Sequence, residues 1–187
     1  MIAGTHRGRR LNAPRTDDLR PTSDRVREAL FSILGNRLTT SRFLDLYAGT
    51  GAVGIEAVSR GATHVTSVES DRAALKLLQQ NVRICQIGDE LSMRAQAVEE
   101  FLRNPTQWNG PYDIVFADPP YSNAQEFSSL LSEPRTDQLF SADSWLVIEH
   151  ATRTTLSITL GSRQFLRRYR YGDTTLSLYS GPDAGRP

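Results

Sequence analysis

Hydrophobic residues along the chain follow two spacings that alternate with each other. Short apolar runs predict buried strands, and apolar positions three or four residues apart predict helices that bury one face. The strands are expected near 43–48, 64–69, 91–96, 113–118 and 144–150. The helices are expected near 53–60, 71–84, 97–103 and 123–133. This alternation predicts an α/β fold with helices on both faces of a mostly parallel sheet.

The two ends of the chain depart from this alternation. Near the carboxyl end, 164–171 and 174–180 are strand-like runs around Gly172 and Asp173, which predicts an antiparallel hairpin. At the amino end, an irregular segment or hairpin over 1–20 precedes an amphipathic helix. We therefore expect an amino-terminal basic extension with its helix (1–36), a main α/β domain (37–181) and a short tail (182–187).

A glycine-rich turn follows the first expected strand. Gly49, Gly51 and Gly54 lie between that strand and a helix, where glycine lets the backbone approach a ligand closely. Glu69 ends the next strand twenty residues after Gly49, the spacing expected for an acid that binds ribose hydroxyls. The spacing alone fits a nicotinamide or flavin dinucleotide as well as other adenosine-containing ligands.

Asp45 is the polar residue that interrupts the first strand. Strands that precede a dinucleotide site usually stay apolar up to the first glycine, so Asp45 disfavours an oxidoreductase. A carboxylate at this position could hold the ammonium group of a methionine moiety, directly or through water. The alternative is a strand acid satisfied by backbone groups or water.

Asp118 to Tyr121 is the second candidate motif, and it follows the apolar run 112–117. Open α/β sheets bind ligands beyond the carboxyl ends of their strands, which is where this turn is expected. The prolines supply no N–H, so carbonyls dominate the turn. The Asp118 carboxylate and the Pro119 carbonyl could accept from one planar NH2 group, and the Tyr121 ring could stack on a base. The alternative is an ordinary turn that ends a strand.

These residues resemble a known enzyme family. Leu44 to Gly51 resembles motif I of class I S-adenosylmethionine-dependent methyltransferases, and Asp118 to Tyr121 resembles motif IV of the branch that methylates amino groups. Other segments resemble the amino-terminal signature and the closing hairpin of the RsmD family, namely Ile2 to Gly4, Arg7 to Leu11, Arg20 to Phe31 and Tyr171 to Thr174. The resemblance spans nearly the whole chain.

The resemblance implies a Rossmann-like class I methyltransferase fold with a seven-stranded sheet over 37–181 and S-adenosyl-L-methionine as cofactor. It implies that the target is the exocyclic N2 amino group of a guanine in 16S ribosomal RNA, within an assembled or assembling small subunit. The expected catalytic residues are Asp118, Pro119, Pro120 and Tyr121. The expected cofactor-binding residues are Asp45, Tyr47, Gly49, Gly51, Glu69, Ser70, Gln96, Ala97 and Asp118.

Gln96 departs from the usual methyltransferase pattern. Many of these enzymes carry an acid after the third strand that accepts from the adenine amino group. The carbonyl of Gln96 can accept one such hydrogen bond, and a surface glutamine at a strand end is the alternative.

The net charge of +1 conceals an uneven distribution. Residues 1–42 hold nine arginines and four acidic residues, a balance of +5, so the rest of the chain carries −4. Basic residues gathered in one part of a near-neutral chain indicate a partner with a phosphate backbone. The residues expected to contact RNA are Arg7, Arg9, Arg10, Arg20, Thr22 and Arg25. The role of a smaller cluster, 163–170, stays open.

Composition and chain length narrow the classes of protein that remain possible. The 187 residues suit one domain, Cys85 is the only cysteine, and three scattered histidines have no metal-ligand spacing, so we expect no metal. With no long apolar run and a polar start, we expect a cytoplasmic protein without membrane contact. We also expect a monomer. A DNA amino-methyltransferase would need a target-recognition region, and a protein glutamine methyltransferase typically has Asn at the place of Asp118. A non-catalytic RNA-binding module would not need both motifs.

Overall fold

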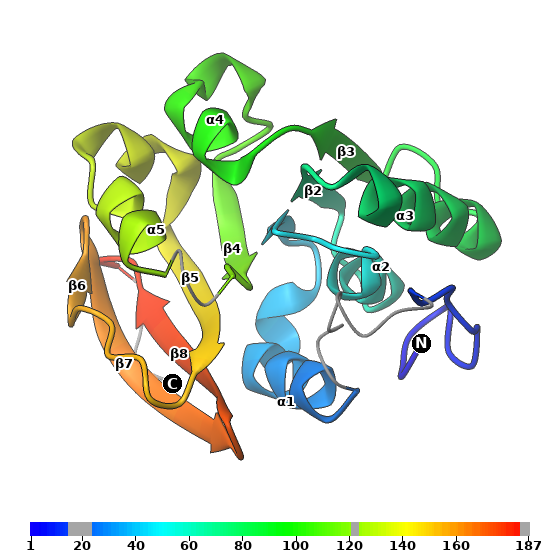
Figure 1. The fold of residues 1–187 in the computed structure, drawn as a ribbon, viewed down its shortest axis with the longest axis horizontal. Helices are drawn as coiled ribbons and strands as arrows, with labels where there is room; N and C mark the ends of the chain where they lie inside the picture. The colour runs from blue at the N-terminus through cyan, green and yellow to red at the C-terminus, as the bar shows by residue number, and fades with distance from the viewer. Residues whose placement is uncertain (15–23, 121–123, 184–187) are drawn as a thin grey trace.

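An eight-stranded sheet forms the centre of the computed structural model, which describes residues 1–14, 24–120 and 124–183 (Figure 1). The strand order is β3-β2-β1-β4-β5-β8-β7-β6. The strands are β1 (Arg42–Leu46), β2 (His64–Glu69), β3 (Leu91–Ala95), β4 (Tyr112–Ala117), β5 (Phe140–Ala151), β6 (Thr159–Leu160), β7 (Arg163–Tyr171) and β8 (Thr174–Ser180). Strands β1 to β5 pair in parallel, whereas β6, β7 and β8 are antiparallel to their neighbours.

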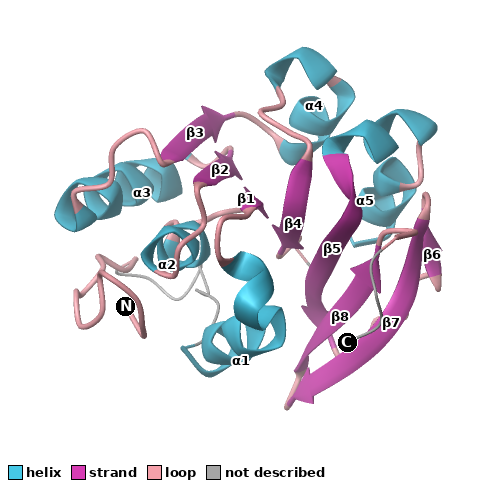
Figure 2. Ribbon diagram, turned by 180° about the vertical axis from the view of Figure 1, so that it is seen from behind, coloured by secondary structure: helices cyan, strands magenta, loops and turns pink. Residues whose placement is uncertain are grey.

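Helices cover both faces of the sheet (Figures 1 and 2). They are α1 (Asp24–Leu34), α2 (Ala52–Ser59), α3 (Arg72–Cys85), α4 (Val98–Arg103) and α5 (Ala124–Leu131). Three short 3-10 helices are η1 (Gly35–Leu38), η2 (Pro105–Gln107) and η3 (Pro134–Leu139). None of the helices in the described ranges is long and apolar enough to cross a bilayer.

The two faces bury separate hydrophobic cores, as strand alternation requires. Phe43 and Phe116 point toward the core that α1, α2 and α3 cover, together with Leu30 and Leu78. Leu44 and Ala117 point to the opposite core, which α4 and α5 cover. The alternation of helices and strands in the sequence therefore places each strand end between two packed layers.

The predicted fold class is confirmed, with one strand more than expected. The additional strand, β6, has only two residues and pairs with Arg163 and Gln164. A two-residue strand carries no periodicity, so a sequence pattern cannot reveal it. Strand β5 also begins earlier than expected, at Phe140, and a register shift in the pairing of β4 with β5 accommodates its first residues.

The amino-terminal segment forms turns and no paired strand within the described range 1–14, so this part gives no hairpin. It is attached to α2 and α3. The buried Glu56 carboxylate accepts hydrogen bonds from the backbone of Ile2 and Ala3, both at 2.9 Å. Gly4 lies so close to α2 that a Cβ there would be 1.8 Å from the Ser59 carbonyl oxygen.

Candidate cofactor and catalytic site

Parallel pairing brings the two candidate motifs to one edge of the sheet, which we call the carboxyl edge because β1 to β4 end there. Leu46 is in register with Val68 on one side and Ala117 on the other. The glycine turn, Glu69 and Asp118 follow these positions directly. The Asp118 N–H donates to the Leu46 carbonyl at 3.4 Å, which joins the two motifs.

The glycine turn has the backbone conformation that its sequence requires. Gly49 and Gly51 have positive φ angles of 54° and 77°, a region that glycine enters without strain. Tyr47, just before them, also has a positive φ of 61°, which is uncommon for a residue with a side chain. A Cβ on Gly49 would meet nothing within 4 Å, whereas a Cβ on Gly51 would lie 2.0 Å from Leu78 Cδ1. Gly49 therefore faces open space, and Gly51 allows α3 to pack closely.

Gly54 serves packing. Its N–H donates to Asp45 Oδ2 at 2.9 Å, and a Cβ there would lie 2.7 Å from Ser67 Oγ. Gly54 belongs to α2, and its missing side chain lets this helix pack closely against the buried strands β1 and β2.

The Glu69 carboxylate holds three backbone N–H groups. Its Oε2 accepts from Gly49 at 2.7 Å, and its Oε1 accepts from Ser70 and Asp71 at 2.8 Å each. Glu69 therefore fixes the turn after β1 to the start of α3. Each carboxylate oxygen has a second lone pair, so these contacts leave acceptor capacity for a ribose hydroxyl.

Asp45 is almost fully buried, with 1 % of its surface exposed. Its pKa is raised from 3.8 to about 8, chiefly by burial and also by the nearby carboxylates of Glu69 and Asp118, against the opposing effect of the hydrogen bond from Gly54. The three carboxylates are close enough to interact, so the site has a concentration of negative potential. A cationic ligand group beside them would favour the ionised form of Asp45.

Tyr47 connects the glycine turn to the helices of the opposite face. Its hydroxyl donates to Glu99 Oε1 at 2.8 Å, and its ring packs edge-to-face on Phe127 with centroids 5.7 Å apart. Burial and the Glu99 carboxylate raise the pKa of Tyr47, so the phenol stays protonated.

Gln96 and Ala97 begin the segment between β3 and α4. The Gln96 N–H donates to the Glu69 carbonyl at 3.0 Å, and its side-chain Nε2 donates to Gln107 Oε1. With its NH2 group so engaged, the Gln96 amide oxygen is the atom suited to accept from an adenine amino group. Ala97 precedes the first residue of α4 in an extended conformation.

The turn after β4 is partly described. Asp118 is half-buried, Pro119 is buried and Pro120 is exposed. Tyr121, expected to stack on a base, lies outside the described residues, and so do Arg20 and Thr22 among the expected RNA contacts.

The remaining expected RNA contacts differ in their surroundings. Arg7, Arg10 and Arg25 are exposed. Arg9 is half-buried, and its Nη1 donates to the Ile84 carbonyl at the end of α3 at 2.6 Å. Arg9 therefore attaches the amino-terminal segment to the domain, in addition to any role toward RNA.

Sequence reasoning missed Asn81, a fully buried residue of α3. Its Oδ1 accepts from the Asn12 N–H at 2.7 Å, and its Nδ2 donates to the carbonyls of Asn12 and Thr50 at 3.1 and 3.0 Å. One side chain thus joins the basic segment to the glycine turn. The sequence signal that could have indicated Asn81 was its polar amide next to Leu78 and Val82, on the apolar face of an amphipathic helix.

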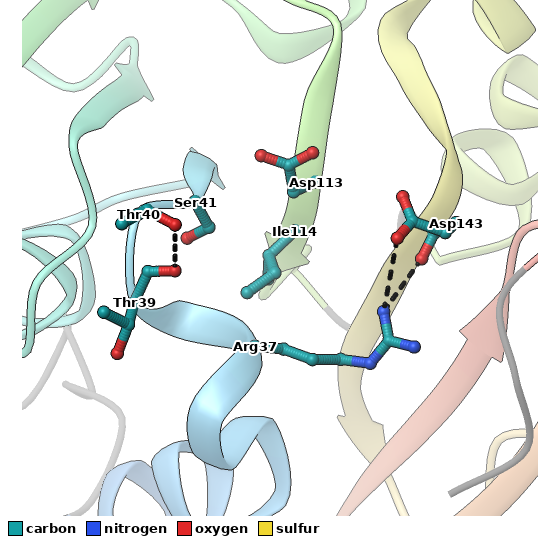
Figure 3. A pocket seen from close by; sticks show the side chains of 7 residues that line it. All are labelled: Arg37, Thr39, Thr40, Ser41, Asp113, Ile114 and Asp143. Atoms are coloured by element: carbon teal, nitrogen blue, oxygen red, sulfur yellow. Dashed lines mark hydrogen bonds and ion pairs between the residues drawn. The ribbon is translucent and has the colours of Figure 1, made fainter.

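A pocket of about 260 Å³ lies at the opposite edge of the sheet (Figure 3). Its lining residues are Arg37, Thr39, Thr40, Ser41, Asp113, Ile114 and Asp143. Arg37 contacts Asp143, and Asp113 accepts from the Arg42 N–H at 2.8 Å, so these polar groups are engaged with one another. The pocket is at the amino ends of β1 and β4, away from both motifs.

Comparison with known proteins identifies the relatives of the chain. The family model described as "Conserved hypothetical protein 95" matches residues 1–180. "Ribosomal RNA small subunit methyltransferase D" of Escherichia coli K12 is 38% identical over 80% of this chain and 70% of its own length. "Putative rRNA methyltransferase YlbH" of Bacillus subtilis is 31% identical over 96% of this chain and 97% of its own.

The chain belongs to the RsmD family. The solved structure titled "Putative methyltransferase yhhF from Escherichia coli" has a TM-score of 0.79 and 31% identity, covering 99% of this chain and 98% of that one. An RNA methyltransferase from Salinibacter ruber, in complex with S-adenosyl-L-homocysteine, has a TM-score of 0.63 at 18% identity and covers 88% and 95%. The RsmD-family chain therefore has the class I methyltransferase fold that its motifs predicted.

Proposed function

We propose that this RsmD-family protein is an S-adenosylmethionine-dependent methyltransferase that modifies the N2 amino group of a guanine in 16S ribosomal RNA. The observation that carries the proposal is the junction of the two motifs, where Asp118 follows β4 directly beside the glycine turn after β1. Relatives named as small-subunit rRNA methyltransferases give the class of substrate. The guanine N2 specificity rests on the chemistry of the Asp118 turn and on the family resemblance.

The residues at the carboxyl edge fit S-adenosylmethionine. Gly49 offers open space above the turn, and Glu69 retains acceptor capacity for ribose hydroxyls. Gln96 would accept from the adenine amino group, and Asp45 would favour the positively charged methionine end. When bound, the cofactor supplies an electrophilic methyl group on a sulfonium.

Asp118 and Pro119 would orient the guanine amino group. Its nitrogen is a weak nucleophile because its lone pair is delocalised into the ring. If the Asp118 carboxylate and the Pro119 carbonyl each accept one N–H, they favour loss of that conjugation and stabilise the positive charge that develops on nitrogen. The turn at the carboxyl edge would also position the nitrogen against the methyl group that the bound cofactor supplies, which lowers the entropic part of the barrier. Tyr121 would stack on the base after it leaves its helix.

The partner and setting follow from the substrate. We propose that a monomer acts in the cytoplasm on an assembled or assembling small subunit, with 1–36 facing RNA and 37–181 carrying the chemistry. The exposed Arg7, Arg10 and Arg25 would contact phosphates. Asn81 and Glu56 hold this basic segment against the domain that carries the glycine turn.

Mass spectrometry tests the function directly. Small subunits from a strain that lacks this protein are incubated with it and with methyl-labelled cofactor, and the rRNA is digested to nucleosides. We expect one labelled N2-methylguanosine per particle, with naked 16S rRNA and a DNA duplex assayed in parallel. Label on another atom or base refutes the guanine N2 assignment, and label on DNA alone refutes the RNA assignment. The Asp118→Ala protein is the control for contaminating activity.

A further inference from the structure

Exposed arginines also gather on the carboxyl-terminal hairpin, far along the chain from the basic amino terminus. Arg167, Arg168 and Arg170 are exposed on β7, and Arg153 is exposed just after β5. Within the described residues, none of the four forms an ion pair. The hairpin turn holds one acid, Asp173, so this region has an excess of positive charge.

The strand register places these arginines level with the Asp118 turn. Ala117 pairs with Ile148, Ile148 pairs with Ser177, and Ser177 pairs with Arg168. Three steps between neighbouring strands put Arg168 roughly 14 Å from Ala117 across the sheet. Arg170 is two residues farther toward the carboxyl edge, in the direction of the target site.

The hairpin presents positive charge on both of its faces. Arg168 and Arg170 are two residues apart in β7, so both point to the same face of the hairpin. On that face, the Arg168 guanidinium lies 5.6 Å from the centre of the Phe165 ring. Arg167 lies at a register shift, and its guanidinium is 5.3 Å from the centre of the Tyr169 ring. These contacts restrain the long side chains, which reduces the entropy lost when they bind a phosphate.

The loop after β5 belongs to the same surface. The Thr152 N–H donates to the Asp173 carbonyl at 2.8 Å, and its hydroxyl donates to the Gly172 carbonyl at 3.0 Å. Arg153 is therefore held next to the hairpin turn. Figure 2 shows β7 as a long outer strand with the short β6 beside only one end of it, and β6 pairs only with Arg163 and Gln164.

We propose that the four exposed arginines of this hairpin surface, Arg153, Arg167, Arg168 and Arg170, bind phosphates of the RNA strand that flanks the target nucleotide. The inference rests on the proposed function, because it takes ribosomal RNA as the substrate. It adds a second contact surface on the other side of the Asp118 turn from the glycine turn. The competing explanation is edge protection, in which charges on β7 only prevent pairing with another chain.

Salt dependence of binding separates the two explanations. The Arg168→Gln/Arg170→Gln protein and wild type are titrated with small subunits at several salt concentrations, and affinity for S-adenosyl-L-homocysteine is measured by calorimetry. For two lost phosphate contacts, the logarithmic salt slope should flatten by roughly 1.4 to 1.8 units. Cofactor affinity and turnover at saturating RNA should stay unchanged while the apparent KM for RNA rises.

The matched control removes the same charge elsewhere. Arg83→Gln/Arg103→Gln changes exposed arginines of α3 and α4 and should leave the salt slope as in wild type. If the double hairpin variant aggregates, the single Arg170→Gln change should flatten the slope by about half as much. An unchanged slope in a folded hairpin variant overturns this inference alone. A wild-type protein that does not bind small subunits overturns the proposed function as well.

Discussion

The two halves of the site are held in place by different means. On the cofactor side, the Glu69 and Asp45 carboxylates accept from four backbone N–H groups, so these acids shape the turns they belong to. On the substrate side, two prolines without N–H groups stiffen the turn, and the Asp118 backbone attaches it to β1 at 3.4 Å. A change on the cofactor side should therefore alter structure and binding together, whereas a change at Asp118 should alter chemistry with little effect on structure.

Replacing Asp118 should give the largest effect. Asp118→Ala removes the carboxylate that orients the amino group and stabilises its developing charge, so turnover should fall about a hundredfold or more. Affinity for S-adenosyl-L-homocysteine and the melting temperature should change little, because the prolines keep the turn. Single-turnover assays, calorimetry and thermal unfolding measure the three quantities. Near-normal turnover would contradict the catalytic role of Asp118. A large loss of stability would contradict the proposal that the substrate side of the site keeps its structure without this side chain.

Glu69 should show the opposite behaviour. Glu69→Ala should weaken cofactor binding by roughly 1.5–3 kcal/mol, the range for a charge-assisted hydrogen bond. It should also lower the melting temperature, since the Gly49 N–H loses its acceptor. Glu69→Gln keeps one carbonyl acceptor for the backbone N–H groups. Its melting temperature should therefore stay closer to the wild-type value than that of Glu69→Ala, while its cofactor affinity should still fall. Unchanged affinity by calorimetry would sink the assignment of Glu69 to the ribose.

Asp45 makes stability depend on pH. Its pKa rises from an ordinary value near 3.8 to about 8, chiefly through burial, so between these pH values the folded protein holds a proton that the unfolded chain releases. Its contribution to stability is complete below about pH 4 and is lost as pH rises toward 8, by at most about 1.4 kcal/mol per pH unit. The stability of the wild type relative to Asp45→Asn should fall as pH rises across this range, while the lowered pKa values of His6, His64 and His150 affect both proteins alike. Parallel curves would mean that Asp45 is ionised when folded.

The sequence predicted where the site residues lie along the sheet better than it predicted which residues they hydrogen-bond. Apart from β6 and the first residues of β5, the strands, the glycine turn and Asp118 were placed correctly, because hydrophobic periodicity and parallel topology determine where strand ends meet. The pattern could not show that Glu69 already holds Gly49 or that Gly54 packs against Asp45, because these contacts depend on side-chain geometry between distant segments. Asn81 was also missed, because a single polar residue in the apolar stripe of a helix does not reveal which distant backbone groups it bonds.

The basic amino-terminal segment gives the smallest and most selective test. It lies on the cofactor side, where Asn81 bonds both Asn12 and Thr50, yet Arg7 and Arg10 are exposed while Arg9 bonds the end of α3. Arg7→Ala/Arg10→Ala should flatten the salt dependence of RNA binding by roughly 0.7–0.9 units per lost contact and leave cofactor affinity intact. Arg9→Ala should lower the melting temperature slightly and change the slope less. Titration against small subunits at several salt concentrations measures the slopes. If the arginines only keep the segment soluble, every salt slope should stay unchanged. If Arg9→Ala flattens the slope as much as Arg7→Ala/Arg10→Ala does, Arg9 both attaches the segment and contacts RNA.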